Sequence, residues 1–346
     1  MTFNITLQPS GHEFEAKEGE SLLDAGLNHG LSLPYGCRNG ACGACKGHIV
    51  SGEVDYGDRN TSCLSDDERN AGTVLCCQAQ PIGDVVVQVK EISSTAEIKP
   101  KIMPARVIKK EKLSHDVMQL ELKLPESQRM QFLAGQYIEI LLKGGKRRAF
   151  SIANAPHQDD VIVLQIRHVP DGYFSGHVFD EMKDNALLRV EGPFGGFYLQ
   201  EESERPIILV GGGTGYAPLN GMLEHAHSLE MKNDFHLFCG VRAKRDVYMQ
   251  KQTDSLSERM DKLNVTTVLS DPEASDDWKG ETGYVHEAVV KQFDDLSGFD
   301  IYMSGPPVMV NAAKEAFLKQ GAKEDQMYSD AFEFSAETQQ AIDDGK

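Results

Sequence analysis

The chain has 346 residues, a formal net charge of −18 and a hydrophobic content of 40%. This length exceeds one ordinary hydrophobic core and indicates two or three domains. The negative charge disfavours nucleic acid as a partner, because phosphate binding requires clustered Lys and Arg, and no apolar run approaches the roughly 18 to 20 residues that span a bilayer.

The N-terminus and the cysteines point to one compartment. The first residues, MTFNITLQPSG, contain neither a basic stretch nor an apolar core of a secretory signal. The seven cysteines are an odd number, and several of them cluster, which argues against a secreted disulfide framework. We therefore expect a cytoplasmic protein whose thiols stay reduced for metal or redox chemistry.

Residues 1–92 predict a small β-rich domain. Residues 3–7 alternate apolar and polar side chains, as in a half-buried strand, and Ser21 is a suitable N-cap for the helix that follows. Two more strands are expected at 46–54 and 84–91. Residues 93–103, SSTAEIKPKIM, have no period and predict a linker.

Three cysteines of this domain have the spacing C-x4-C-x2-C, at Cys37, Cys42 and Cys45. This spacing supplies three thiolates of a [2Fe-2S] cluster, whereas zinc sites usually use cysteine pairs on two separate knuckles. The glycines and alanines between them let the loop wrap closely and turn backbone N–H groups toward the sulfurs. The fourth ligand is Cys76 or Cys77, because Cys63 and Cys239 lie elsewhere in the chain. Only one of the two can reach the iron, since neighbouring side chains of an extended segment face opposite ways.

The same region resembles plant-type ferredoxins, in which the fourth cysteine stands four residues before a proline. That resemblance implies Cys77, before Pro81, as the fourth ligand, with Cys76 as a small buried residue. Cys63 is expected to be structural or simply exposed.

Residues 104–203 predict a second, all-β domain. Short β-branched or alternating segments, separated by turn residues, indicate an antiparallel barrel or sandwich. They lie at 106–113, 117–124, 136–142, 148–152, 161–169 and 187–190.

Residues 204–335 change to alternating strands and helices, which is typical of a doubly wound parallel sheet. Strands are expected at PIILVGGG, FHLFCGV, VTTVLS and DIYMSG, and helices at 218–230, 254–263, 286–293 and 307–320. The polar residues 336–346 predict a loose tail.

Three motifs of the second domain resemble those of the ferredoxin–NADP reductase superfamily: RAFS at 148–151, IRHV with GYFS at 166–175, and GPFG at 192–195. The resemblance implies an antiparallel flavin barrel that binds FAD. It implies that Arg148 pairs with a phosphate, that Phe150 stacks on the cofactor, and that Ser151 reaches flavin N5. The expected flavin-binding residues are Arg148, Ala149, Phe150, Ser151, Ile166, His168, Val169, Gly172, Phe174 and Ser175.

The motif GGTGYAP at 212–218 follows an apolar strand and begins a helix, the context in which glycines let a pyrophosphate approach a helix N-terminus. It resembles the G-G-T-G-x-A-P of the same superfamily, as do CG at 239–240 and SGPP at 304–307. The resemblance places these residues at a nicotinamide nucleotide and gives catalytic roles to Ser151 and Cys239. The expected residues are Gly212, Gly213, Thr214, Gly215, Pro218, Cys239, Gly240, Gly305 and Pro306.

NADH is the expected nucleotide, with NADPH possible. Arg242, Lys244 and Arg245 follow the second strand of the nucleotide domain, yet Asp246 stands beside them and LSDPEASDDWKG is acidic. A carboxylate at this place favours a free ribose 2′-hydroxyl over a 2′-phosphate.

The whole chain resembles the ferredoxin-first electron-transfer reductases of this superfamily. The implied fold is multidomain α+β and α/β, with a β-grasp ferredoxin domain, a β-barrel flavin domain and a doubly wound nicotinamide domain. The implied path runs from NAD(P)H to FAD, to the [2Fe-2S] cluster and to a protein acceptor. LPYGCRNGACGACKG and CCQAQP are closest to members that serve a pyridoxamine-dependent dehydrase. Neighbouring members serve an oxygenase component, and a non-catalytic redox sensor is the alternative of another class.

Overall fold

The computed structural model describes residues 1–29, 31, 33–35, 40–91, 98–125 and 130–332, in two compact units. The first unit comprises Met1–Lys99 with Phe194–Phe197, and the second comprises Pro100–Pro193 with Tyr198–Lys346. Phe194–Phe197, which the sequence assigned to the flavin domain, groups with the first unit, where Gly196 N–H donates to the Tyr35 carbonyl at 2.8 Å. Among the described helices, none has the length and apolar content needed to cross a membrane.

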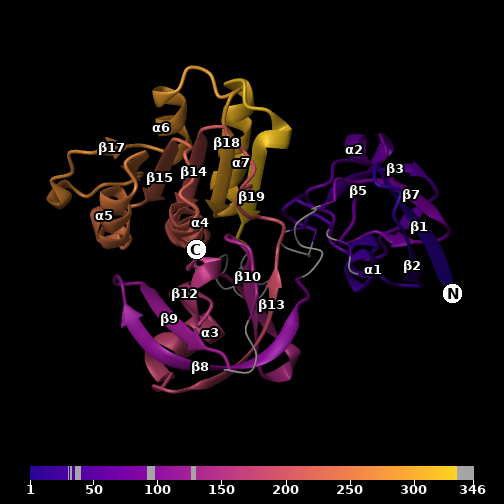
Figure 1. Cartoon of the computed structure of the whole chain (residues 1–346), viewed down its shortest axis with the longest axis horizontal. Coiled ribbons are helices and arrows are strands. Elements are labelled where there is room, and N and C mark those ends of the chain that lie inside the picture. Colours follow the sequence, from indigo (N-terminus) through magenta and orange to yellow (C-terminus); the bar gives the residue numbers. More distant parts are fainter. Residues whose placement is uncertain (30, 32, 36–39, 92–97, 126–129, 333–346) are drawn as a thin grey trace. The chain divides into compact units, whose positions relative to one another are not determined.

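The first unit is a β-grasp domain, drawn in indigo and purple in Figure 1. Its sheet has the order β2-β1-β7-β3-β5, in which β1 and β7 are parallel and the other neighbours antiparallel. Ser21 begins the main helix as expected, because its hydroxyl accepts the Asp24 N–H at 3.0 Å. The elements are β1 (Thr2–Gln8), β2 (Glu13–Lys17), α1 (Leu22–Asn28), β3 (Lys46–Ser51), β4 (Val54–Asp55), α2 (Asp66–Asn70), β5 (Thr73–Leu75), β6 (Gln80–Pro81) and β7 (Val85–Gln88).

The segment with the two adjacent cysteines differs from the expectation. The extended stretch ends at Leu75, and Cys76–Gln78 form a turn in which the N–H groups of Gln78 and Ala79 both donate to the Leu75 carbonyl at 2.9 Å. The Cys77 sulfur lies 3.2 Å from that of Cys45, whereas the Cys76 sulfur packs against Gly47 of β3. The linker expected at 93–103 lies partly outside the described residues, and β8 already begins at Lys101.

The barrel of the second unit contains all six strands expected from the sequence. Its sheet has the order β11-β10-β13-β8-β9-β12, and an antiparallel bridge between Ile152 and Leu164 joins the two edges and closes it. The interior is filled by aliphatic side chains such as Leu120, Ile138 and Leu164. The elements are β8 (Lys101–Lys112), β9 (Val117–Lys123), β10 (Tyr137–Leu141), β11 (Arg147–Ser151), β12 (Val161–Arg167), α3 (Tyr173–Gly176) and β13 (Leu187–Phe194).

The remainder of the second unit is a doubly wound sheet of order β17-β16-β15-β14-β18-β19, with every neighbouring pair parallel. Four expected strands and four expected helices are present, and β17 and β19 are additional. The elements are β14 (Ile207–Gly212), α4 (Tyr216–Ser228), β15 (Phe235–Val241), α5 (Gln250–Arg259), β16 (Leu263–Leu269), β17 (Glu281–Thr282), α6 (Val285–Gln292), β18 (Asp300–Gly305), α7 (Pro307–Lys319) and β19 (Met327–Ala331).

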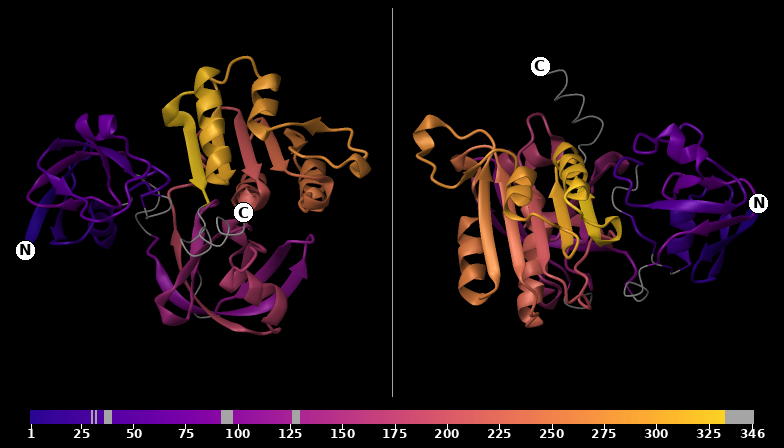
Figure 2. Two further views of the ribbon diagram at one scale, coloured as in Figure 1. Left: turned by 180° about the vertical axis from the view of Figure 1, so that it is seen from behind. Right: turned by 90° about the horizontal axis from the view of Figure 1, so that it is seen from above.

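Helices cover both faces of this sheet (Figures 1 and 2). One face packs against α6 and α7 through a core that includes Ile208, Phe238, Ile301 and Phe317. On the other side α4 packs with α5, and nine of the 13 residues of α4 are buried. Because all strands are parallel, their carboxyl ends meet at one edge of the sheet, where dinucleotide sites of such folds lie.

Candidate functional site

The thiols of Cys45 and Cys77 lie together in the first unit. Their sulfurs are 3.2 Å apart, and both residues are buried. The contact with the Cys77 sulfur raises the pKa of the Cys45 thiol far above its usual range. Two thiolates so close repel each other unless a cation lies between them, so this donor pair fits a metal cluster. Cys42 is half-buried, and Cys37, the remaining expected ligand, lies outside the described residues.

Cys76 faces away from this pair. Its sulfur packs against Gly47 of β3, where an added Cβ would lie 3.4 Å from it. Burial raises the pKa of the Cys76 thiol to about 12, so the group stays protonated. These surroundings match the small buried residue that the resemblance implied.

The loop before Cys42 is shaped by one obligatory glycine. Gly40 has a φ of +83°, and a Cβ there would lie 1.9 Å from the Asn60 carbonyl oxygen. The Cys63 thiol donates to the Gly40 carbonyl at 3.0 Å, so Cys63 lies at this loop. The sequence had not connected Cys63 with the cluster loop. The contacts of Gly40 with Asn60 and Cys63 therefore hold the backbone before Cys42 close to the segment 60–63.

In the second unit, one row of register partners crosses the carboxyl end of the parallel sheet. Cys239 of β15 pairs with Gly211 of β14, Gly211 pairs with Ser304 of β18, and Ser304 pairs with Asp330 of β19. The Ser304 hydroxyl is buried and has no hydrogen-bond partner among the described residues. An unpaired buried hydroxyl at this edge fits a site that a polar ligand completes.

The two glycine motifs meet backbone to backbone beside this row. A Cβ on Gly215 would lie 2.0 Å from the Ser304 carbonyl oxygen, and a Cβ on Gly305 would lie 2.8 Å from the Gly212 carbonyl oxygen. Thr214 lies between Gly213 and Gly215 in the turn before α4, Pro218 is buried in the first turns of α4, and Pro306 precedes α7. The two motifs therefore meet here without intervening side chains, as close approach of a dinucleotide requires.

Cys239 is fully buried and Gly240 is half-buried. Burial raises the pKa of the Cys239 thiol to about 12, so the thiol stays neutral. Gly240 packs under α6, where a Cβ would lie 2.9 Å from Cβ of Val285. In this structure Cys239 supports the sheet edge from within, and its predicted catalytic contact stays a prediction.

Ser151 of the RAFS motif reaches that row. Its hydroxyl is buried and donates to Asp330 Oδ2 at 3.3 Å, although the two residues lie 179 positions apart. No sequence motif includes Asp330, so its place beside Ser151 was not predicted. The contact brings the flavin motif to the carboxyl ends of β18 and β19.

The other residues of RAFS take different directions along β11. Phe150 is half-buried, with its ring centroid 5.5 Å from that of Phe174, so two of the expected flavin motifs meet. Ala149 is exposed opposite Glu139. Arg147, which precedes the motif, pairs with Glu139 at 2.7 Å and with Glu191, and these carboxylates raise the pKa of its guanidinium. Arg148 is half-buried and donates to the Arg147 carbonyl at 2.8 Å.

The GYFS loop is folded tightly on itself. The Ser175 hydroxyl accepts the Val169 N–H at 3.1 Å and lies 3.3 Å from the carbonyls of Val169 and Gly172. A Cβ on Gly172 would lie 2.5 Å from that hydroxyl oxygen. Ser175 therefore shapes the loop from inside. Ile166 is buried in the barrel core, and the His168 ring packs on Phe179 at a centroid distance of 4.9 Å.

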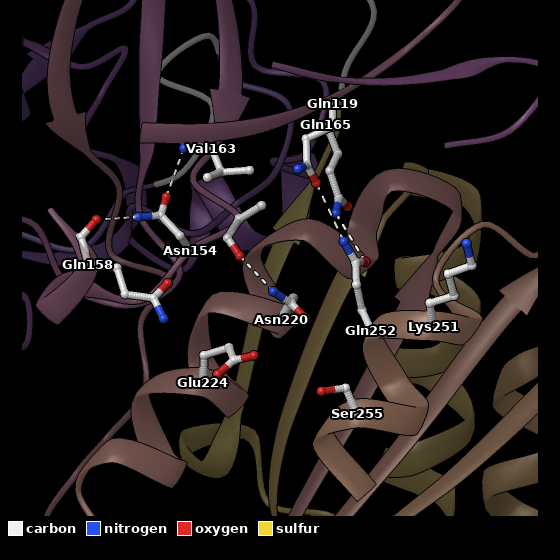
Figure 3. A pocket seen from close by; sticks show the side chains of 11 residues that line it. Gln119, Asn154, Gln158, Val163, Gln165, Asn220, Glu224, Lys251, Gln252 and Ser255 are labelled. Carbon is white, nitrogen blue, oxygen red and sulfur yellow. Dashed lines mark hydrogen bonds between the residues drawn. The ribbon is translucent and has the colours of Figure 1, made fainter. Parts of the chain in front are cut away.

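A chain of polar side chains joins the barrel to the nucleotide loop. The Tyr248 hydroxyl lies 2.9 Å from Gln165 Oε1 and 3.3 Å from the Gly213 carbonyl oxygen. Burial raises the pKa of Tyr248 well above its usual range, so the hydroxyl remains a donor. Gln165 Nε2 donates to Gln252 Oε1 of α5, and Gln252 Nε2 donates to Gln119 Oε1 of β9, each at 3.4 Å. These amides line a cavity of about 320 Å³ (Figure 3).

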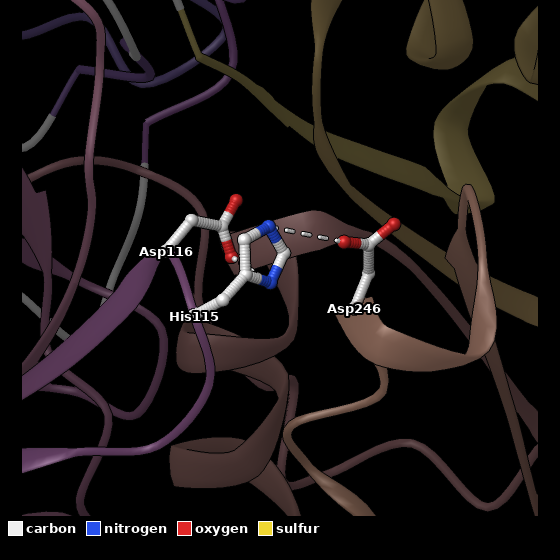
Figure 4. Close-up of side chains that lie close together, drawn as sticks. All are labelled: His115, Asp116 and Asp246. Carbon is white, nitrogen blue, oxygen red and sulfur yellow. Dashed lines mark ion pairs between the residues drawn. The ribbon is translucent and has the colours of Figure 1, made fainter.

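A second set of contacts joins the loop before β9 to the loop after β15 (Figure 4). His115 lies 3.7 Å from Asp246, and the neighbouring Asp116 accepts from Arg167 Nε at 2.8 Å. Arg167 Nη1 lies 3.2 Å from the point where a Gly213 Cβ would be. A guanidinium therefore lies at the glycine loop. The sequence had not proposed Arg167, although it lies inside the quoted motif IRHV.

The chain matches three family models: the 2Fe-2S iron-sulfur cluster binding domain at residues 5–81, the oxidoreductase FAD-binding domain at 104–198 and the oxidoreductase NAD-binding domain at 209–315.

Two curated proteins show the range of relatives. The CDP-6-deoxy-L-threo-D-glycero-4-hexulose-3-dehydrase reductase of Yersinia pestis is 34% identical over 332 residues, covering 96% of this chain and 99% of its own. Phenol hydroxylase P5 protein of Acinetobacter pittii is 29% identical over 337 residues, covering 96% and 95%.

Among solved structures, the Amycolatopsis cytochrome P450 reductase GcoB matches with a TM-score of 0.80 and 31% identity, over 96% of this chain and 99% of that chain.

We predict that Cys77→Ser abolishes the visible absorption of the cluster, because it removes one of the two adjoining sulfurs, whereas Cys76→Ser leaves it intact. Both variants should keep NADH–ferricyanide turnover, because ferricyanide takes electrons from a flavin directly. Absorption spectra of the purified variants check this. A cluster that survives in Cys77→Ser and disappears in Cys76→Ser would show that the ligand assignment is wrong.

We also predict that Ser151→Ala and Asp330→Asn each slow flavin reduction by NADH by roughly tenfold or more, because this pair orients the reacting partners. Rapid mixing without oxygen measures the rate, and flavin content should stay at the wild-type level. Ser329→Ala is the matched control, since neighbouring side chains of β19 point to opposite faces. Wild-type rates of flavin reduction in both Ser151→Ala and Asp330→Asn would show that this pair takes no part in hydride transfer.

Proposed function

Because the chain belongs to the reductases that join a [2Fe-2S] domain to FAD- and NAD-binding domains, we propose that it delivers electrons from NADH to a pyridoxamine-dependent dehydrase. The chain is an NAD(P)H-dependent flavin and iron–sulfur oxidoreductase that passes electrons to a partner protein. The observation that supports the choice of dehydrase is the similarity to the dehydrase reductase of Yersinia pestis, which is 34% identical over 96% of the chain. An aromatic O-demethylase reductase subunit and a 2-halobenzoate dioxygenase electron transfer component reach the same identity, but over 92% and 86% of the chain.

The proposed roles of the residues follow from their positions. Bound FAD and the cluster supply the conversion of a two-electron hydride donor into single-electron transfers. The backbone from Gly213 to Gly215, together with Gly305, receives the pyrophosphate of the nucleotide, and the Arg167 guanidinium lies where it can neutralise phosphate charge. Cys37, Cys42, Cys45 and Cys77 are the proposed cluster ligands.

At the flavin, Arg148 is proposed to pair with a phosphate and Ser151 to lie at the isoalloxazine. The Ser151–Asp330 contact, at 3.3 Å, supports this assignment, because it places the RAFS motif at the end of the sheet where the nicotinamide is expected. Hydride transfer needs the two rings in close contact with water excluded, and Ser151 itself is buried.

The contacts beyond β15 support NADH as the donor. Lys244 donates through its backbone N–H to Asp276 Oδ2 and through Nζ to the Asp276 carbonyl, both at 3.0 Å. Arg245 lies 3.2 Å from Glu273. Asp246 accepts the Ala243 N–H at 2.9 Å. A 2′-phosphate would meet the negative charge of these carboxylates, whereas a ribose 2′-hydroxyl would not be repelled by them.

An oxygenase component is the second candidate acceptor, favoured by the likeness to the cytochrome P450 reductase at a TM-score of 0.80. The non-catalytic sensor has no such support, because the chain matches all three family models and the two relatives described above are named as a dehydrase reductase and a phenol hydroxylase protein.

Reconstitution tests the acceptor. We expect that NADH oxidation without oxygen accelerates only when the chain is mixed with both a purified CDP-6-deoxy-L-threo-D-glycero-4-hexulose-3-dehydrase and its sugar nucleotide. Cys77→Ser should lose this coupled rate while keeping ferricyanide turnover. Phenol hydroxylase components, in oxygenated buffer with phenol, form the second arm. Coupling in that arm and none with the dehydrase would replace the proposed acceptor by an oxygenase.

We further expect a higher kcat/KM with NADH than with NADPH. In the double variant Glu273→Gln/Asp276→Asn, the ratio of the two kcat/KM values should be smaller than in the wild type. The double variant removes two negative charges beside Lys244 and Arg245, so these cations can attract a 2′-phosphate, and a total effect of about 1 kcal/mol corresponds to a gain of roughly fivefold for NADPH. Asp277→Asn, in the same loop, is the control. Unchanged NADPH kinetics in the double variant would contradict the charge argument.

A further inference from the structure

We propose that the side-chain amide of Gln78 sets the reduction potential of the [2Fe-2S] cluster, by donating a hydrogen bond to the sulfur of Cys77. Gln78 Nε2 lies 3.5 Å from Cys77 Sγ, within hydrogen-bonding range for a sulfur acceptor. Both residues are buried. The inference rests on the proposed role of Cys77 as a cluster ligand, and it assigns Gln78 as a positioning residue that acts through that sulfur.

The backbone and the aliphatic part of Gln78 are held in place from several sides. Gln78 lies in the turn after β5, where its backbone N–H donates to the Leu75 carbonyl at 2.9 Å. Arg59 Nη1 lies 3.5 Å from the Gln78 carbonyl oxygen, and the same guanidinium donates to the Gly19 carbonyl at 3.0 Å. The aliphatic part of the side chain packs against Gly40, where an added Cβ would lie 2.9 Å from Gln78 Cγ. The side chain is therefore wedged between the cluster loop and Cys77.

The orientation of the amide follows from chemistry. A thiolate that ligates iron has no proton and can only accept hydrogen bonds, so the nitrogen of Gln78 faces it, not the oxygen. A bond to a charged acceptor away from water is stronger than one between neutral groups. Gln78 thus presents a fixed dipole to one ligand of the cluster.

The sign of the effect follows from charge. Reduction adds one electron, and hence one negative charge, to the cluster and its thiolates. A hydrogen-bond donor stabilises that added charge and raises the reduction potential. Removing it should make the cluster harder to reduce by the flavin, and placing a carboxylate there should do so more strongly.

The sequence offers a matched control within CCQAQP. Gln80 carries the same amide two residues further along, on β6, and it makes no hydrogen bond to a sulfur among the described residues. Gln80→Leu therefore removes an amide from the same segment without touching Cys77. Gln78→Leu removes the donor, and Gln78→Glu keeps the shape and, at a pH where its carboxyl is ionised, replaces the donor by an acceptor.

Redox titration of the full-length holoenzyme, followed by electron paramagnetic resonance of the reduced cluster, measures the effect. We expect the equilibrium constant for cluster reduction to fall roughly threefold to tenfold in Gln78→Leu, which is about 30 to 60 mV at 59 mV per tenfold change. The fall should be larger in Gln78→Glu and absent in Gln80→Leu. The visible cluster absorption and NADH–ferricyanide turnover should remain.

A wild-type potential in Gln78→Leu with an intact cluster would overturn the inference. If Gln78→Leu assembles no cluster, the reduction potential of Gln78→Glu is the test: a value below that of the wild type supports the inference, and a wild-type value overturns it. Loss of the cluster from both would also overturn it, because Gln78 would then serve assembly instead of potential. These outcomes leave the ligand assignment untouched, since only the spectra of the Cys77→Ser and Cys76→Ser variants test that.

Discussion

The contacts between the barrel and the parallel sheet of the second unit are the constraint on which its site depends. Asn220 of α4 donates to the Ala153 carbonyl at 2.8 Å, just after β11, and a Cβ on Gly221 would lie 2.9 Å from the Asn154 carbonyl oxygen. Helix and barrel therefore touch through backbone, with little room for displacement. This close approach brings Ser151 to Asp330 and Gln165 to Tyr248. The end of β11 can meet the ends of β18 and β19 only because the barrel and the parallel sheet are packed together in this way.

The two units hold their functional groups by different means. In the first unit a glycine loop and one turn bring sulfurs together, so local backbone geometry at Gly40 and Cys76–Gln78 decides the arrangement. In the second unit residues far apart in the chain meet across a sheet edge, as Ser304 and Asp330 do by pairing of β18 with β19. The first arrangement suits a compact cluster bound by thiolates. The second suits extended ligands that lie along an edge.

This difference explains what could be predicted from the sequence. The C-x4-C-x2-C spacing and the GGTGYAP motif are local, so their chemistry was visible without a structure. The six barrel strands were also predicted, because each has a clear period. β19 was missed, since MYSDA is short and irregular, and Asp330 was missed with it. Similarly, α2 buries none of its residues, so it left no apolar pattern. The hydrogen bond from Gln78 to Cys77 depends on a turn that strand alternation did not predict.

The central claim is that electrons from NADH enter at the flavin and reach the cluster only through it. Rapid mixing of the oxygen-free protein with limiting NADH, followed at separate flavin and cluster absorption bands, tests this most directly. The account predicts that flavin absorbance falls first and that cluster reduction follows. It also predicts that a preparation stripped of FAD, with its cluster intact, shows no cluster reduction by NADH. Reduction of the cluster in the flavin-free protein would contradict the account.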